Sequence, residues 1–251
     1  MRVFQLVALA VAACGALTAC ASNDPRRQPK MSSEARLQVG EAADAAGNTD
    51  LAIAMYTAAA QSDPANIALQ LRCADALARS GKIGEARQFL EERLSKRSGQ
   101  PDLLRALALV DLVAGQPDQA IAGFNKVLAI NPSDVATRVD MAVALDLQGQ
   151  HTAAQEIYRQ VLAATPNDPA TRNDLAVSMM LEGRTRQALE TLAPLEDSAT
   201  AAPRLKVNLG ILYAATGDSE RSRQLLGDRA SDTELLALTR ALARPISGSS
   251  P

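Results

Sequence analysis

Side chains that could perform catalytic chemistry are sparse in this sequence. The chain contains one histidine, His151, and three cysteines, and two of these, Cys14 and Cys20, lie in or beside an N-terminal apolar segment. The remaining pair, His151 and Cys73, is too small a set for a His/Cys metal centre. The glycines form no phosphate-binding loop and no nucleophile elbow is present. The acidic pair Glu91-Glu92 fits a solvated helix surface. Taken together, these observations lead us to expect no enzymatic activity, no metal and no cofactor.

Cys20 is the residue best placed for covalent chemistry. Arg2 precedes an apolar stretch over residues 3–16, and Leu17-Thr18-Ala19-Cys20 follows. That stretch reaches roughly 21 Å as a helix, short of the ~30 Å hydrocarbon core of a bilayer. We therefore expect a signal peptide over residues 1–19. The tetrapeptide resembles the lipobox of bacterial lipoproteins, which implies acylation of the Cys20 thiol. The segment ending at Cys14 fits a looser form of the motif, and an ordinary signal peptide is the alternative.

Acylation of Cys20 would fix the mature chain to a membrane, because two or three fatty chains anchor stably. Ala21 stands where the sorting rules of lipoproteins place an aspartate for inner-membrane retention, so the resemblance implies the periplasmic side of the outer membrane. Residues 20–32 read as the lipidated cysteine and a tether, whose basic residues either contact anionic headgroups or are merely solvated. Cys73 has no partner for an intramolecular disulfide, and we expect it to be buried.

The composition indicates a folded helical protein. Hydrophobic residues make up 47% of the chain, charged residues 22% and aromatic residues 2%, with no tryptophan and a net charge of −2. This balance is far from that of disordered chains and carries no basic footprint for nucleic acid. The abundance of alanine and leucine favours helices. We expect neither nucleic acid nor a small-molecule substrate as a ligand.

A 34-residue period organises the rest of the chain. Six glycines recur at this interval, namely Gly47, Gly81, Gly115, Gly149, Gly183 and Gly217. A small residue lies seven positions before and another five positions after each glycine, and a bulky residue lies nine positions after it. Around Gly149 these residues are Ala142, Ala154 and Tyr158. The pattern predicts antiparallel helix pairs with a glycine at positive φ in each turn and small residues where the two helices meet.

The repeat resembles the tetratricopeptide repeat, in which such pairs stack into a solenoid. Leu209-Gly210 with Tyr213 matches the first-helix signature of that family, and Ala154 with Tyr158 matches the second. Prolines at positions 64, 132 and 166 close three units. The family's tryptophan slot is filled instead by Arg36, Gln70, Leu104, Arg138, Arg172 and Lys206.

The expected fold is all-α, a right-handed α-solenoid of six tetratricopeptide units. They run over residues 33–66, 67–100, 101–134, 135–168, 169–202 and 203–236. Residues 237–251 should form a cap and a disordered tail. His151, in a turn, should be exposed to solvent at the start of a helix.

The concave side of such a solenoid is formed by the first helix of each unit and usually binds proteins. The first two units place acids such as Glu41 and Asp75 there, whereas the later four are largely aliphatic. We therefore predict an apolar groove that takes a hydrophobic helix or extended segment, formed by Leu109, Leu112, Val143, Val177, Met180 and Ile211. The alternative is that part of this stripe is core between helices. Only Asn173 suits a carboxylate clamp, which is therefore not expected.

The local sequence over residues 135–226 is similar to that of TadD, the family of tetratricopeptide lipoproteins of the tight adherence (Flp) pilus system. The segments are 141–151, 154–159, 173–178, 192–195 and 203–209, and Pro194, inside a second helix, is a further shared departure from the generic repeat. The resemblance implies an outer-membrane accessory protein that helps a secretin channel assemble or localise. Its partner would be a protein, either a secretin or another pilus-assembly component. The N-terminal lipid would attach it to the membrane. The alternatives are a pilotin-like or envelope-maintenance lipoprotein of another system, or an activator of a peptidoglycan enzyme.

Overall fold

The computed structural model describes residues 31–196 and 203–227. The expected signal peptide, Cys20, most of the tether and the segment from residue 228 onwards lie outside the described residues. Within the two described ranges the regular structure is helical throughout, with twelve α-helices, one 3-10 turn and no strand. The all-helical fold expected from the repeat is confirmed.

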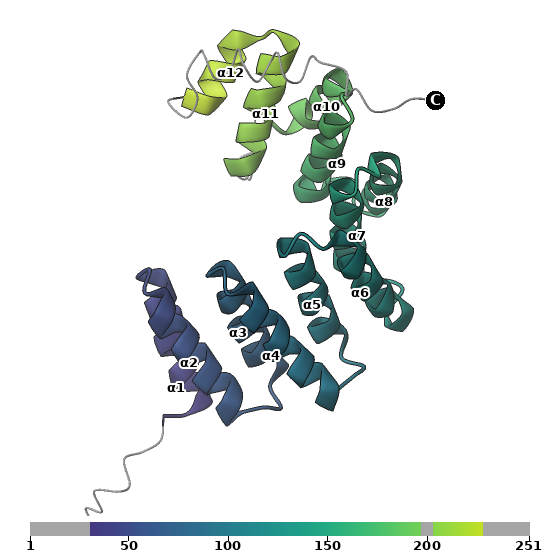
Figure 1. The fold of residues 1–251 in the computed structure, drawn as a ribbon. Coiled ribbons are helices and arrows are strands. Elements are labelled where there is room, and N and C mark those ends of the chain that lie inside the picture. The colour runs from purple at the N-terminus through teal and green to yellow at the C-terminus, as the bar shows by residue number, and fades with distance from the viewer. Residues whose placement is uncertain (1–30, 197–202, 228–251) are drawn as a thin grey trace, which may run out of the picture.

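The helices form consecutive helix-turn-helix pairs that follow one another along an arc (Figure 1). The first helices begin 34 residues apart. The pairs are α1 (Ser33–Ala45) with α2 (Thr49–Ser62), α3 (Ile67–Arg79) with α4 (Ile83–Lys96), α5 (Pro101–Val113) with α6 (Pro117–Ile130), α7 (Val135–Leu147) with α8 (His151–Ala164), α9 (Pro169–Leu181) with α10 (Thr185–Leu192), and α11 (Pro203–Thr216) with α12 (Ser219–Leu226). Each pair packs against the next, which makes the described chain a solenoid.

Local chemistry fixes where the helices begin. The side chain of Asp134 accepts a hydrogen bond from the Thr137 backbone N–H at 3.1 Å, and Asp168 accepts from the N–H groups of Ala170 and Thr171. These contacts satisfy amide groups that a helix leaves without intrahelical partners. Proline occupies the first turn of α5, α6 and α9, where its missing N–H costs nothing.

The turn within each pair depends on a glycine in the left-handed region. All six repeat glycines have positive φ, between 71° and 96°. At Gly149 the glycine N–H donates to the Asp146 carbonyl at 2.9 Å, and the next N–H, of Gln150, donates to Leu145 at 2.9 Å. These bonds cap the first helix and turn the chain back. The predicted role of the glycines is confirmed.

Replacement of a turn glycine should cost stability through backbone strain alone. A methyl group at Gly149 would meet no described atom within 4 Å, so the Gly149→Ala variant tests φ without a clash. We expect a loss of about 1 kcal/mol in the free energy of unfolding, measured by urea titration. Gly84 lies in α4 without positive φ and also in open space. Gly84→Ala should instead add about 0.5–1 kcal/mol. Equal effects of the two substitutions would contradict this account.

Small residues allow the two helices of a pair to approach closely. A Cβ atom at Gly40 would lie 2.7 Å from Cε1 of Tyr56, and one at Gly210 would lie 2.5 Å from Cγ of Leu226. In both pairs the bulky residue nine positions after the turn glycine therefore occupies the space above the small one. This is the packing that the sequence pattern predicts.

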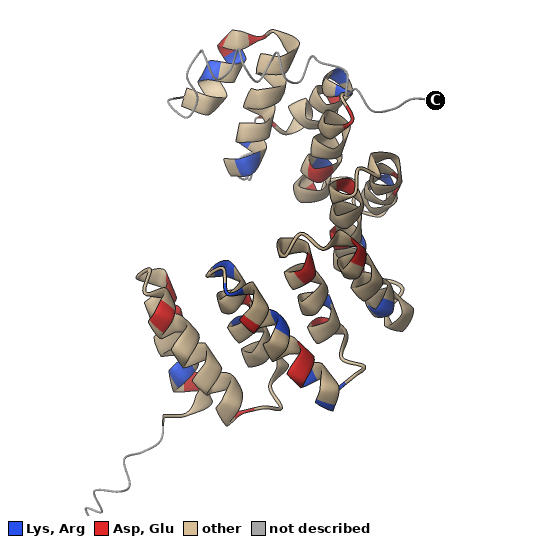
Figure 2. Cartoon of the chain, viewed as in Figure 1, with Lys and Arg blue, Asp and Glu red and all other residues tan. Residues whose placement is uncertain are grey.

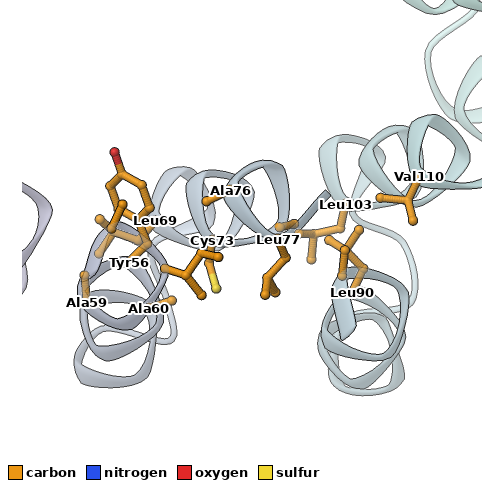
Figure 3. Packing of buried hydrophobic residues seen from close by; sticks show 14 of the residues in the cluster. Tyr56, Ala59, Ala60, Leu69, Cys73, Ala76, Leu77, Leu90, Leu103 and Val110 are labelled. Atoms are coloured by element: carbon orange, nitrogen blue, oxygen red, sulfur yellow. The ribbon is translucent and has the colours of Figure 1, made fainter. Parts of the chain in front are cut away.

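The buried hydrophobic side chains form two large clusters, a small one between them, and a second small one on α11 and α12 that contains Ala214 and Leu226. The N-terminal cluster spans α1 to α5 and includes Tyr56, Leu90 and Leu103 (Figure 3). The C-terminal cluster spans α7 to α11 and includes Tyr158 and Leu209. The central cluster consists of Ala108, Ala120, Phe124 and Ala144, from α5, α6 and α7. Its one aromatic ring packs with three buried alanines, and Leu109, Leu112, Ile121 and Met141 pack against the cluster from outside.

Cys73 lies in the N-terminal cluster, as expected. It is fully buried, and its Sγ lies 3.3 Å from Oγ1 of Thr57. Burial raises the pKa of the thiol, so it is held in its protonated form.

The tryptophan slot of the family is used differently here. Gln70, Arg138 and Arg172 each donate from the side chain to the carbonyl of the proline six residues earlier, Pro64, Pro132 and Pro166 respectively. Long polar side chains thus tie the loop between units to the following helix by hydrogen bonds.

Pro194 does not lie inside the second α-helix of its unit, contrary to expectation. The α-helix α10 ends at Leu192, and Pro194 falls in the 3-10 turn η1 (Ala193–Leu195). Proline lacks the N–H that an α-helix requires and its ring crowds the preceding turn. α10 is therefore 8 residues long, whereas α8 has 14. The chain after it is held by Tyr213, whose hydroxyl donates to Glu196 at 2.5 Å.

Candidate protein-binding groove

An apolar pocket of about 610 Å³ opens between the first helices of the second and third units, α3 and α5. Its apolar lining consists of Leu71, Ala74, Ala78, Ala106, Leu109, Val110 and Val113. Its charged lining consists of Asp75, Arg79, Asp102 and Arg105. A concave apolar surface of this size is large enough to take hydrophobic side chains of a protein partner.

Most of the charged groups around this pocket, hereafter the α3–α5 pocket, neutralise one another. Arg79 bridges Asp44 at 2.8 Å and Asp75 at 2.9 Å, and its guanidinium lowers the pKa of Asp44. Arg105 pairs with Asp140 of the next unit at 2.6 Å. Because these charges are paired, the rim of the pocket has little preference for a charged partner. The apolar lining therefore dominates the chemistry of the pocket.

A row of exposed aliphatic residues extends from the pocket along the later units. Val113, Leu147 and Leu181 are 65%, 62% and 45% exposed. They end α5, α7 and α9 at the same repeat position, two residues before the turn glycine. This aliphatic row was not predicted from the sequence, although its 34-residue spacing and its place beside the glycines could have shown it. Because these side chains recur at one position of stacked units, they offer successive apolar contacts along the solenoid.

The six predicted groove residues are all half-buried, but they do not form one lining. Leu109 lines the α3–α5 pocket. Leu112 packs against the central cluster, while Val143 and Met180 pack against the C-terminal cluster. Val177 on α9 and Ile211 on α11 belong to none of the clusters of buried residues. Part of the predicted stripe is therefore core between helices, the alternative that the sequence had left open.

Polar residues interrupt the apolar stripe expected for the later units. Asp140 and Asp174 precede Val143 and Val177 by three residues and so share their helix faces. Asn208 donates to Asn173 at 2.8 Å, and Asn173 donates to Asp174 at 3.3 Å. Asn173 thus uses its amide within the protein, where it is not available for a carboxylate ligand.

Asp146, three residues after Val143 on the same face of α7, is enclosed by hydrogen bonds rather than presented to a partner. Its carboxylate accepts from the Ser178 hydroxyl at 2.6 Å and the Tyr158 hydroxyl at 3.2 Å. Nδ1 of His151 lies 2.9 Å from the same carboxylate. His151 begins α8, as expected, but its predicted solvent exposure is wrong because this contact leaves its side chain only 18% exposed. The network connects the fourth and fifth units.

The half-buried carboxyl of Asp174 should make stability depend on pH. Desolvation raises the pKa of this carboxyl above its ordinary value of 3.8. As pH rises through that value the unfolded chain ionises first, so the wild type loses stability until the folded group has also ionised. We expect Asp174→Asn to be more stable than the wild type at about pH 7, with the difference vanishing near pH 3 in urea titrations.

Asp134 supplies the control of opposite sign. Desolvation is offset there by hydrogen bonds from the backbone and hydroxyl of Thr137, and the net effect lowers the pKa of its carboxyl. The stability that this carboxylate contributes is present above the unfolded pKa and lost as pH falls. Asp134→Asn should therefore be less stable than the wild type at about pH 7 and equal to it in acid. The same pH trend in both variants would refute the assignment.

Metal ligands and membrane-spanning helices are both absent from the described part of the chain. Over residues 31–196 and 203–227, no three His, Cys, Asp or Glu side chains are grouped as metal ligands would be. No helix in the same ranges is both long and apolar enough to cross a bilayer. Cys20, the predicted lipidation site, lies outside these ranges.

Comparison with known proteins identifies the repeat. The sequence pattern of the tetratricopeptide repeat matches residues 45–110, 112–176 and 147–206, and a second pattern of the same description matches residues 203–228. No curated protein matches the chain as a relative.

Solved structures share the fold at low sequence identity. PilW, a type IV pilus biogenesis factor, is 19% identical with a TM-score of 0.66, over 82% of this chain and 97% of PilW. TTC0263, a tetratricopeptide repeat protein of Thermus thermophilus, is 18% identical with a TM-score of 0.62, over 72% of this chain and 98% of its own. The pilF protein of Pseudomonas aeruginosa is 15% identical with a TM-score of 0.61, over 83% and 97% of the two chains. With the repeat pattern covering most of the described helices, this chain belongs to the tetratricopeptide repeat family.

Proposed function

We propose that this chain is an outer-membrane-anchored scaffold that assists assembly or localisation of the Flp/Tad pilus secretion apparatus. Its partner would be a secretin or another assembly protein. The observation that carries the binding role is the α3–α5 pocket together with the aliphatic row of Val113, Leu147 and Leu181. Val113 belongs to both, so a partner could fill the pocket and continue along the row.

The binding step is the burial of apolar surface on a preformed platform. A hydrophobic segment of the partner would place one anchor side chain against Leu109 and Val113 in the pocket. Each Å² of apolar surface removed from water contributes about 25 cal/mol to the binding free energy. Burial of one anchor side chain in the pocket therefore supplies only part of the affinity, as a central contact does in other interfaces. Because the solenoid is already folded, little ordering cost opposes binding on its side.

The pilus assignment draws on two independent resemblances. The sequence of residues 135–226 is similar to that of the TadD lipoproteins. PilW, which shares the fold, is itself a type IV pilus biogenesis factor. A lipid on Cys20 would hold the scaffold at the periplasmic leaflet and raise its effective concentration near a membrane-embedded channel. Scaffolding of this kind needs no catalytic residue.

Affinity capture of the full-length protein from detergent-solubilised envelopes tests the proposal. We expect recovery of a secretin-type channel or other pilus-assembly proteins, weakened in a Cys20→Ala variant. Fatty-acid labelling of the same two proteins should mark the wild type alone. Recovery of peptidoglycan enzymes, or loss of another envelope structure on gene deletion with Flp pili intact, would overturn the pilus role and favour the two alternatives.

A further inference from the structure

The outer face of the first unit is open at positions that are covered in every later unit. On α1, Ala42 is exposed and Val39 is 39% exposed. The residues at the position of Ala42 in the five later units are all buried, namely Ala76, Val110, Ala144, Ser178 and Leu212. Each of those first helices packs against the second helix of the preceding unit, as α3 packs against α2. The first unit has no described unit before it, so this side of α1 stays open (Figure 1).

Three residues of α2 extend the same face, namely Leu51, Ala54 and Ala58. Their equivalents in the third unit line one cavity with Arg87 of the second unit; these are Gln119, Ala122 and Lys126. The three positions therefore lie on the side of a second helix that faces the preceding unit. Together with Ala35, Val39 and Ala42 of α1 they form the surface hereafter called the N-terminal end face.

The N-terminal end face is uncharged, unlike the same positions of other units. Later second helices carry polar or charged residues there, such as Glu85, Gln88 and Glu92 on α4. In Figure 2 α4 is banded in red and blue, whereas α2 contains a single charged residue, Asp50. The terminal units of a solenoid normally need a polar outer face to remain soluble. An apolar outer face at this end is therefore suited to being covered.

The parts of the chain nearest to this face do not supply the cover. Residues 21–30, which precede the described range, contain no large aliphatic or aromatic side chain. The sixth unit lies at the opposite end of the arc (Figure 1). The cover must therefore come from outside the chain.

We propose that a second copy of this chain covers the N-terminal end face, so that two copies pair through α1 and α2 about a two-fold axis. A two-fold contact brings the same patch of both copies together, and an uncharged patch does so without opposing like charges. The four alanines keep the face flat, which lets helices of the two copies approach closely. Val39 and Leu51, which is 41% exposed, supply the larger apolar side chains that pairing removes from water.

A membrane surface fits this face less well. Helices that lie on membranes combine large apolar side chains with basic flanks. Here most of the face is alanine, and the charged neighbours in sequence are the acids Glu34 and Asp50. The Asp50 side chain is 93% exposed, so it would meet anionic headgroups unfavourably.

The size of the face predicts a weak dimer. Helices of 13 and 14 residues, α1 and α2, are about 20 Å long and pack about 10 Å apart, which gives on the order of 400 Å² per copy. Stable complexes bury about 800 Å² per partner, so pairing should depend on protein concentration. The inference is independent of the pilus role, because it depends only on the composition and exposure of this face.

Thiol cross-linking of the full chain in isolated envelopes tests the proposal. The single variants Val39→Cys and Ala54→Cys each place a thiol on the N-terminal end face, and a short bismaleimide joins two such thiols only where two copies meet. We expect a product of twice the chain's mass, above the level seen with the wild type, whose Cys73 is buried and protonated. Ala153→Cys, at the position of Leu51 in the fourth unit, is the matched control and should give no such product. Absence of the dimer at both sites, or cross-linking to a protein of another mass instead, would overturn the proposal.

A charged variant separates specific pairing from chance collision. Leu51→Glu with Ala54→Glu introduces the residues found at these positions as Glu85 and Glu156, so the helices should be kept. Two carboxylates from each copy would then face each other, which should lower the yield of the Val39→Cys dimer roughly tenfold or more. Ala122→Glu with Ala153→Glu places the same charges at the same repeat positions of the third and fourth units and should leave the yield unchanged. An unchanged yield in the folded Leu51→Glu, Ala54→Glu variant would show that the dimer arises by collision, and the proposal would fail.

Discussion

Phe124→Ala should split the unfolding of this solenoid into two transitions. Phe124 is fully buried among Ala108, Ala120 and Ala144 in the central cluster, and the half-buried side chains of Leu109, Leu112, Ile121 and Met141 pack against that cluster. Its removal should cost about 3–5 kcal/mol, because the side chains around the lost ring can relax only partly into the cavity. Because each unit of a solenoid contacts only its neighbours, a weakened interface in the middle uncouples the two sides.

Hydrogen exchange followed by mass spectrometry along a urea titration reports the two halves separately. In the wild type we expect α1–α4 and α9–α12 to lose protection together, and in Phe124→Ala at different urea concentrations. Leu90→Ala is the matched control, since Leu90 is equally buried but lies within the N-terminal cluster. It should destabilise the protein by about 2–5 kcal/mol without a comparable separation centred on α6. A single transition in Phe124→Ala would contradict the division of the core.

Val113→Lys combined with Leu147→Lys should abolish capture of the envelope partner. Both side chains are more than half exposed and end their helices, where a lysine interacts favourably with the helix dipole. The variant should therefore fold normally, with unchanged helical circular dichroism. Two charges placed across an apolar contact have to be desolvated on binding, and central contacts of this kind account for about 2 kcal/mol or more each, about 30-fold in affinity.

Ile130→Lys is the matched control for the aliphatic row. Ile130 is 51% exposed and also ends its helix, but it lies on α6, the second helix of its unit. Capture should survive in this variant and weaken progressively in the single and double row variants. If the double variant folds and still captures the partner, the aliphatic row is not the binding surface. Loss of capture in Ile130→Lys would place contacts on the second helices instead.

The period of the sequence was sufficient to predict the fold because its rules are local. A glycine every 34 residues forces each turn, and a residue such as Gly40 or Gly210 leaves room for the bulky side chain of the paired helix. Caps such as Asp134 are also set by near neighbours in the chain. These interactions join residues within one unit, so they can be read without knowledge of how the units stack.

The candidate site depends on stacking between units, and here the sequence was less informative. Whether an aliphatic residue on a first helix packs half-buried against a core cluster, like Val143, or stays on the surface, like Leu147, is decided by the neighbouring unit. The full enclosure of Asp146 requires Ser178 from the following unit, although the contact between His151 and Asp146 lies within one unit.

The sequence alone determined the helical solenoid, its turns and the lack of an evident catalytic set. Tertiary structure alone decided which side chains remain exposed and which polar atoms remain unpaired. Arg93 on α4 shows the reason. The Nε atom of Arg93 and the Oε1 atom of Gln70 are both buried without a partner among the described residues, although α4 reads in the sequence as an ordinary amphipathic helix. Hydrophobic periodicity specifies a helix and its inner face, whereas the pairing of individual polar atoms depends on contacts between segments distant in sequence.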